Sequence, residues 1–182
     1  EKKVEMLGKV YHMLTLAYGV PPTEFTWSQR DKDGKVVSTD KYTPLSFYNK
    51  LWGYDLNNDY VLVMNDPSRE YYKVYQIEYD RHTYDGHDWV YLNLPNEEVK
   101  PMLIASLKDS TAMYISCDVN KFLNRQKGVM DLKNFDYESL LGVTMTMDKK
   151  ERIITHASAS SHAMTLIAVD IDKATSKPTK WM

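Results

Sequence analysis

One histidine, His162, stands where an imidazole could take part in chemistry. It follows four small residues in the stretch SASSHAMTLIAV (158–169) and opens an apolar run that is typical of a β-strand. An imidazole at the mouth of a strand can act as a general acid or base, but it needs a nucleophile beside it. The chain has one cysteine, Cys117, and shows no activated serine. Either His162 is structural, or its partner lies outside these residues.

The single thiol does not look like that nucleophile. Cys117 lies in the middle of the run MYISCDVN, between Ser116 and Asp118. A reactive cysteine needs a helix N-terminus or a neighbouring cation to lower the pKa of its thiol. Neither is present in this run, and the carboxylate of Asp118 would raise that pKa. We therefore expect Cys117 to be a packing residue that is chemically quiet.

Two acidic loops could be mistaken for metal sites. His82 and His87 lie in the loop DRHTYDGHD (80–88), whose Asp80, Asp85 and Asp88 are also metal-ligand types, but the spacing matches no closed zinc pattern. A solvated acidic loop is the favoured interpretation. The turn at Asp31, Asp33 and Gly34 resembles the start of a calcium loop, yet Tyr42 stands where that loop needs a glutamate. No metal and no cofactor is expected.

Composition excludes several classes of protein. The chain has 182 residues, of which 43% are hydrophobic and 26% charged, and its net charge is −2. These values suit a globular domain and argue against a basic surface for nucleic acid or membrane. No apolar run of about 18 residues could span a membrane. A single cysteine excludes a disulfide framework and favours a reducing, cytoplasmic location, although export stays open.

The order of the expected elements indicates an α+β fold with an antiparallel sheet or open barrel. Apolar periodicity predicts a first helix, whose face is Val4, Leu7, Tyr11, Leu14 and Tyr18. The further expected elements are a hairpin over 25–39, a helix over 45–52 started by Thr43-Pro44, strands over 60–66, 71–80 and 89–95, a helix over 97–109 capped by Asn96, a strand over 112–119, a last long strand into which the stretch 151–172 carries His162, a turn over 174–179 and the start of a further strand from 180. Both chain ends fall inside such elements, so we expect a piece of a longer protein.

Several stretches together carry a resemblance to a known family. They are, in order, PPTEFTWSQRDKDGK, TPLSFYNK, NDPSREYYKVYQIEY, SLKDSTAMYISCDVNKF, LLGVTMTMDKKERI and SHAMTLIAV followed by TKW. The helix, the strand ending in Cys-Asp, and the later histidine strand resemble the second lobe of papain-like cysteine peptidases. The full set resembles the bleomycin hydrolase and aminopeptidase C family and covers nearly the whole chain.

The resemblance implies roles for particular residues. It makes 1–182 a single segment of a papain-like catalytic domain, incomplete at both ends, with family-specific elements over 1–95 and the barrel lobe over 96–182. It places the catalytic general acid and base on His162. Ser161, directly before it, would border the substrate subsite. The orienting asparagine would follow the last residue of the chain.

The resemblance also implies a function and partners. The nucleophilic cysteine would lie in a Gln-x-x-x-x-x-Cys-Trp stretch on the other lobe, before Glu1. The whole protein would be a cysteine aminopeptidase acting on peptides, assembled as a homohexamer whose C-terminal arm limits access to the site. The segment alone would be inactive. A non-catalytic scaffold that has lost the nucleophile is the alternative, and the residue at that cysteine position would decide between them.

Overall fold

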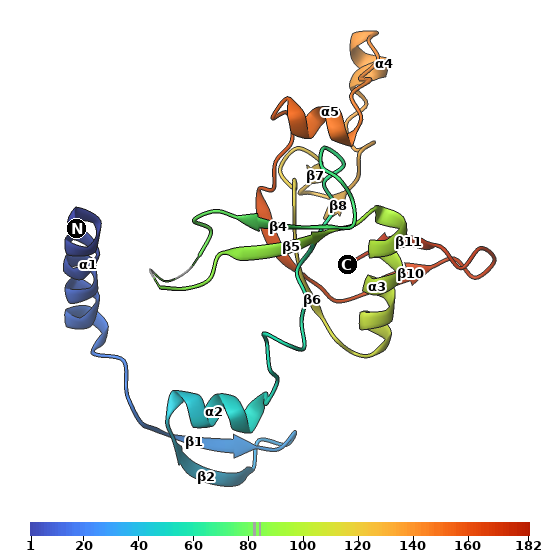
Figure 1. Ribbon diagram of the computed structural model, residues 1–182. Helices are drawn as coiled ribbons and strands as arrows, with labels where there is room; N and C mark the ends of the chain where they lie inside the picture. The colour runs from blue at the N-terminus through green and yellow to red at the C-terminus, as the bar shows by residue number, and fades with distance from the viewer. Residues whose placement is uncertain (82, 84) are drawn as a thin grey trace. The chain divides into compact units, whose positions relative to one another are not determined.

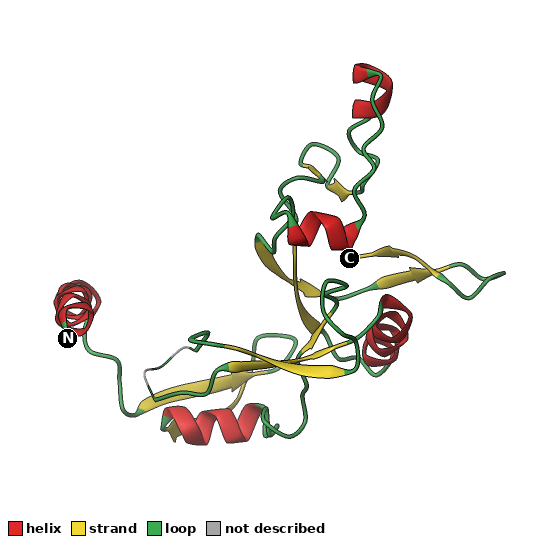
Figure 2. Cartoon of the chain, turned by 45° about the horizontal axis from the view of Figure 1, so that its top comes forward, coloured by secondary structure: helices red, strands yellow, loops and turns green. Residues whose placement is uncertain are grey.

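Helices and short strands are interspersed along the chain (Figure 1 and Figure 2). The computed structural model describes residues 1–81, 83 and 85–182. The helices among them are α1 (Lys2–Tyr18), α2 (Pro44–Leu51), α3 (Asn96–Lys108), α4 (Tyr137–Leu141) and α5 (Lys149–Ile154). The strands are β1 (Phe25–Arg30), β2 (Val36–Tyr42), β3 (Val63–Met64), β4 (Lys73–Ile77), β5 (Trp89–Asn93), β6 (Met113–Cys117), β7 (Leu123–Asn124), β8 (Val129–Met130), β9 (His162–Leu166), β10 (Val169–Ile171) and β11 (Pro178–Trp181).

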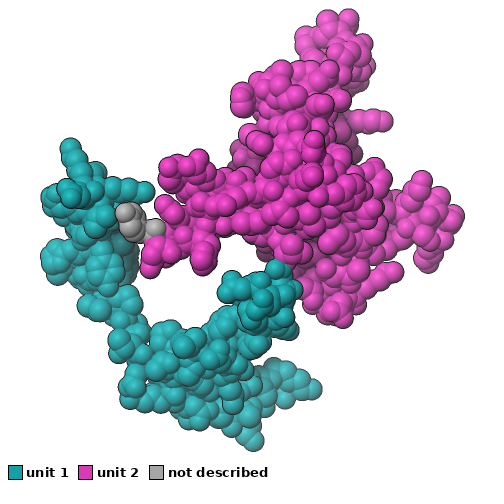
Figure 3. Space-filling model, viewed as in Figure 1, with its two compact units in different colours: residues 1–60 teal, residues 61–182 magenta. Residues whose placement is uncertain are grey.

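Contacts divide the chain into two compact units, Glu1–Tyr60 and Val61–Met182 (Figure 3). The sequence predicted a different division, between family-specific elements over 1–95 and a barrel lobe over 96–182. That division refers to a whole catalytic domain and stays a prediction. Both units contain helices and strands, which agrees with an α+β class. The second unit contains His162 and Cys117, so it holds all the residues that matter for the candidate site.

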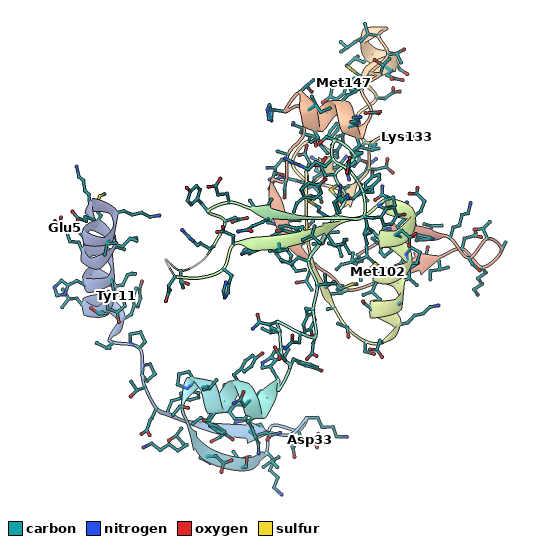
Figure 4. All side chains as sticks on the ribbon, in the orientation of Figure 1. Glu5, Tyr11, Asp33, Met102, Lys133 and Met147 are labelled. Carbon is teal, nitrogen blue, oxygen red and sulfur yellow. The ribbon has the colours of Figure 1, made fainter. Side chains whose placement is uncertain are left out.

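The first unit begins with the predicted helix. Helix α1 ends at Gly19, whose φ of 85° only glycine adopts readily, and the Gly19 N–H donates to the carbonyl of Thr15 at 2.9 Å. Each residue of its predicted apolar face is at least half exposed. Side chains stand on every side of this helix, Tyr11 among them (Figure 4). Its helical form is therefore set by local sequence and not by burial within this unit.

An aromatic cluster holds the rest of the first unit together. The hairpin β1–β2 forms as predicted, and helix α2 starts with a capping box in which Thr43 and Ser46 bond each other's backbone N–H groups. The ring of Phe47, on α2, lies 5.1 Å from Phe25, 5.2 Å from Trp27 and 5.3 Å from Tyr42 between ring centroids. All three pairs meet edge to face, the preferred geometry for aromatic packing.

The second unit opens with a mixed three-stranded sheet in the order β3–β5–β4. Strand β5 pairs antiparallel with β4 and parallel with β3, so the expectation of a purely antiparallel sheet is wrong here. The predicted strand over 60–66 shrinks to the two residues of β3. The remaining sheets are two-stranded, and no closed barrel forms among the described residues.

A buried asparagine fixes the turn beside that sheet. Asn93, at the end of β5, is fully buried. Its side-chain amide donates to the carbonyls of Asp66 at 2.9 Å and Glu70 at 3.1 Å, and its carbonyl oxygen accepts the Asp66 N–H at 2.9 Å. One side chain thus satisfies several backbone groups of the turn over 66–70.

One expected helix cap and one expected strand in this unit differ in the structure. Pro95 occupies the N-cap position of α3 without a side-chain hydrogen bond, and Asn96 is the first helical residue. The stretch 151–172, expected to carry His162 into one long strand, contains the end of α5 and two short strands, β9 and β10. Asp148 starts α5 with a capping box to Glu151, because the Asp148 carboxylate accepts the Glu151 N–H at 2.8 Å. That cap commits 149–154 to a helix before the strand begins.

The last strands form a hairpin. Strands β10 and β11 pair antiparallel, joined by a turn in which Asp172 accepts the N–H groups of Ala174 and Thr175. This hairpin extends away from α3 in both views (Figure 1 and Figure 2). Within the described part of the chain, no helix combines the length and apolar character needed to cross a bilayer.

Candidate active site

His162 is the first residue of β9, as predicted. Strand β9 pairs antiparallel with β6, and the register places His162 opposite Cys117 and Leu166 opposite Met113. On this face of the two strands, burial increases from the exposed His162 through Met164 to Leu166, which is 5% exposed. The imidazole therefore stands at the solvent end of the inward face, mounted on regular structure that fixes its position. The architectural prediction for both strands is confirmed.

Ser161 anchors the histidine to the neighbouring strand β6 and to the residues that follow it. The Ser161 N–H donates to the carbonyl of Cys117 at 3.0 Å. Its hydroxyl oxygen accepts the N–H of Val119 at 3.0 Å and, at 3.5 Å, that of Asn120. Val119 is 5% exposed, so its N–H would otherwise be buried without a partner. The predicted contact of Ser161 with substrate stays a prediction, while its contacts with backbone hold His162 in place.

The loop before His162 is tied to the loop after β6 by side chains. The Ser158 hydroxyl donates to Asp118 Oδ2 at 2.7 Å, and Ser160 bonds the hydroxyl of Ser116. Lys121 lies 3.7 Å from the same Asp118 carboxylate, and its ammonium donates to the carbonyl of Ala157. Residues 157–161, directly before the histidine, are therefore held against 116–121.

The environment of Cys117 suits a protonated thiol. Burial raises the pKa of Cys117, and the neighbouring Asp118 carboxylate raises it further. The Lys149 ammonium acts in the opposite direction with a smaller effect. Burial also lowers the pKa of Lys149, which donates to Asn65 Oδ1. With a raised pKa, Cys117 holds little thiolate near neutral pH and cannot serve as an activated nucleophile.

Two hollows lie on the second unit. One, of about 270 Å³, is mostly polar and includes Lys149 and Asp148 at the start of α5. The other, of about 500 Å³, is lined by Asn120, Lys121, Phe122, Phe135, Tyr137 and Met145. Sequence reasoning did not single out this second set, because the residues come from separate loops whose proximity depends on tertiary structure.

The acidic loops show turns and polar contacts. His82 lies outside the described residues, so the alternatives for that loop stay open there. Asp88 accepts a hydrogen bond from Gln76 Nε2 at 3.0 Å. Asp31 Oδ1 accepts the N–H groups of Asp33 and Lys35, both at 2.9 Å, which closes the β1–β2 hairpin. Among the residues that the structure describes, no three histidine, cysteine or acidic side chains gather closely enough to hold a metal ion.

Comparisons with known proteins identify the family of the chain. The sequence profile of the Peptidase C1-like family matches residues 1–182. Aminopeptidase G of Lactobacillus delbrueckii subsp. lactis is 36% identical over 92% of this chain, and bleomycin hydrolase of Homo sapiens is 35% identical over 97% of it.

A solved structure is also similar. The crystal structure of PepW from Lactobacillus rhamnosis HN001 (DR20) shares 32% identity, covers 98% of this chain and has a TM-score of 0.88. The chain spans about two fifths of each of these proteins: 38% of the aminopeptidase G, 40% of the human hydrolase and 40% of PepW. Family profile, relatives and structure all cover the segment around His162, and on these findings the chain belongs to the Peptidase C1-like family.

Proposed function

We propose that this chain is the histidine-bearing part of a cysteine aminopeptidase that removes N-terminal residues from peptides. The observation that carries the proposal is the exposed His162, fixed at the start of β9 by the backbone contacts of Ser161. The family membership and relatives named aminopeptidase G, aminopeptidase C and bleomycin hydrolase support it. Peptides are the expected substrates, and no cofactor enters the chemistry.

In the proposed mechanism, His162 moves protons for a cysteine thiolate. The thiolate attacks the carbonyl carbon of the scissile amide, and the C–N bond then breaks while the His162 imidazolium gives its proton to the leaving amine. The products are a free amine and an acyl thioester. Neutral His162 next takes a proton from water, the hydroxide attacks the thioester, and the thiolate leaves. This restores the starting thiolate and imidazolium.

We place the nucleophile outside these residues. Cys117 faces His162 across the ladder, but burial and Asp118 keep its thiol protonated. A papain-like pair also needs its two partners on opposite walls of a cleft, and Cys117 lies on the strand beside the histidine. The thiolate is therefore expected from a cysteine on the other lobe of the complete protein, before Glu1. The homohexamer that the family resemblance implies and the cytoplasmic location that the single cysteine favours belong to the same proposal.

The test is hydrolysis of aminoacyl-coumarin substrates by the full-length protein. We expect release of coumarin that the thiol-directed inhibitor E-64 abolishes. We also expect E-64 to label a cysteine in a Gln-x-x-x-x-x-Cys-Trp stretch before Glu1. A serine, alanine or glycine at that position, together with no turnover, would instead identify a non-catalytic scaffold. Turnover that resists E-64 would refute the thiolate mechanism.

A further inference from the structure

Asp118 carries a largely buried carboxylate close to the histidine, and the proposed mechanism gives it no role. It follows Cys117, which faces His162 across the β6–β9 ladder, and its side chain is 11% exposed. The Ser158 hydroxyl donates to Asp118 Oδ2 at 2.7 Å, and the Lys121 ammonium lies 3.7 Å from the same oxygen. These partners are needed because a charge that is removed from water without compensation is costly.

Both partners of Asp118 act on the segment that leads into β9. One of them, Ser158, is part of that segment, and the other, Lys121, donates to the carbonyl of Ala157. The last residue of the segment, Ser161, is bound by backbone groups instead. The Asp118 carboxylate and its ion pair therefore restrain the beginning of the segment, while backbone contacts restrain its end.

His162 needs such restraint because it is the first residue of its strand. Among the described residues, β9 pairs with β6 and with no second strand, and the pair of Cys117 and His162 ends this ladder. Strand ends open locally at a lower free-energy cost than strand interiors. A reacting group that is displaced by about 1 Å can lose about a hundredfold in rate. Contacts that hold the segment before the strand therefore decide where the imidazole lies.

We propose that Asp118 is a positioning residue for His162 and keeps the imidazole where it can protonate the leaving amine. The inference rests on the proposed function and adds a residue to it. Asp118 acts through the segment that begins at Ala157, and Lys121 holds the carboxylate and that segment together. Loss of the carboxylate should slow proton transfer to the amine more than attack by the thiolate, because the thiolate comes from the other lobe.

The experiment compares two substrates of the full-length protein that share one aminoacyl group, the coumarin amide of alanine and an alanyl thioester. The amine of the amide leaves with a proton from His162, whereas the thiolate of the thioester leaves without one. We expect the ratio of kcat/KM for the amide to kcat/KM for the thioester to fall about tenfold in Asp118→Ala. The ratio is independent of how much enzyme is folded, because both substrates meet the same preparation.

Variants of the hydrogen-bond partner extend the test. Ser158→Ala should also lower the ratio, and Ser158→Thr, which keeps the hydroxyl, should retain the ratio of the wild type. The double variant Asp118→Ala/Ser158→Ala should have the same ratio as Asp118→Ala, because both changes remove one shared link.

A matched control removes a carboxylate elsewhere in the same unit. Asp172 accepts the N–H groups of Ala174 and Thr175 in the turn between β10 and β11. Asp172→Ala should therefore keep the ratio of the wild type, although it also removes a carboxylate with hydrogen-bond partners.

The outcomes separate this inference from the proposed function. Equal losses on both substrates in Asp118→Ala, or an equal fall of the ratio in Asp172→Ala, would overturn the inference alone. If Asp118→Ala does not fold, an unchanged ratio in Ser158→Ala has the same consequence. No hydrolysis of either substrate by the wild type would overturn the proposed function and this inference with it.

Discussion

Cys117 and His162 are direct cross-strand neighbours in the β6–β9 ladder, and the N–H of the residue before the histidine donates to the carbonyl of Cys117 at 3.0 Å. Cross-strand neighbours of this kind have Cβ atoms about 5 Å apart. A thiol beside an imidazole would suggest a catalytic pair. Here the pKa of the thiol is raised, so Cys117 does not supply the nucleophile. Its backbone carbonyl instead helps to position the histidine.

Replacing His162 should abolish catalysis by the full-length protein. We expect His162→Ala to lower kcat/KM on aminoacyl-coumarin by at least about a thousandfold, because one residue supplies both proton transfers. His156→Asn is the matched control, since asparagine tolerates the φ of 56° at that position. An undiminished rate in the His162→Ala protein would remove this residue from the catalytic site.

The 182-residue chain alone should show no turnover. Residues that act as one catalytic unit are strongly non-additive, and loss of the nucleophile costs on the order of a million-fold in rate. The same coumarin assay checks this, with the full-length protein measured in parallel. E-64-sensitive release of coumarin by the short chain would show that it holds a nucleophile of its own.

Cys117 should react slowly with iodoacetamide in the folded protein. Its raised pKa means that the folded state retains the thiol proton, so the labelling rate should rise only above the pH where an ordinary cysteine ionises. For the same reason, ionisation of this thiol lowers the free energy of unfolding only as the pH rises past the ordinary pKa of cysteine. Asp118→Asn should shift the labelling profile back toward lower pH. The urea-unfolded protein provides the reference rate, and labelling of the native thiol as fast as a thiolate at neutral pH would contradict the assignment.

Removing the Ser161 hydroxyl should cost stability and misplace the histidine. We expect Ser161→Ala to lower the free energy of unfolding by about 1–2 kcal/mol, because the buried Val119 N–H loses its acceptor. Urea-induced unfolding measures this, and kcat on aminoacyl-coumarin should fall as well. Ser161→Thr, which keeps the hydroxyl, should restore both values.

The neighbouring Ser160 supplies the control. Among the residues that the structure describes, its hydroxyl bonds the exposed hydroxyl of Ser116, so Ser160→Ala should change the free energy of unfolding by less than about 0.5 kcal/mol. Equal losses of stability in both alanine variants would argue against the anchoring role of Ser161.

Asn93 should be intolerant of substitution. Asn93→Ala leaves several buried backbone groups of the turn over 66–70 without partners, and we expect a loss of about 3 kcal/mol in urea-induced unfolding. Asn93→Asp should also destabilise, because an ionised carboxylate cannot donate to the carbonyls of Asp66 and Glu70. The exposed Asn58 is the control, and a loss below about 1 kcal/mol for Asn93→Ala would contradict this account.

Local signals in the sequence predicted local structure well. The three- and four-residue spacing of α1 and the Thr43-Pro44 start of α2 both correspond to helices in the structure. The strand positions of Cys117 and His162 were also predictable, and the family resemblance pointed to the role of His162. By contrast, two local signals compete at 148–154, where the capping box of Asp148 and Glu151 favours a helix and the apolar residues after it favour a strand.

Features that depend on distant contacts could not be predicted. The parallel pairing of β3 with β5 involves two residues of β3, too few to leave a periodic signal. Asn93 is an ordinary polar residue in the sequence, and only the fold shows that it is buried. Phe122 and Phe135 line one hollow because Asn134 bridges their loops, a contact that no local pattern encodes.

The hydroxyl of Ser161 accepts hydrogen bonds from backbone N–H groups and from no side chain in the described structure. Backbone groups are present whatever residue occupies positions 119 and 120, provided that it is not proline. The surrounding sequence can therefore diverge among homologues while the histidine keeps its place.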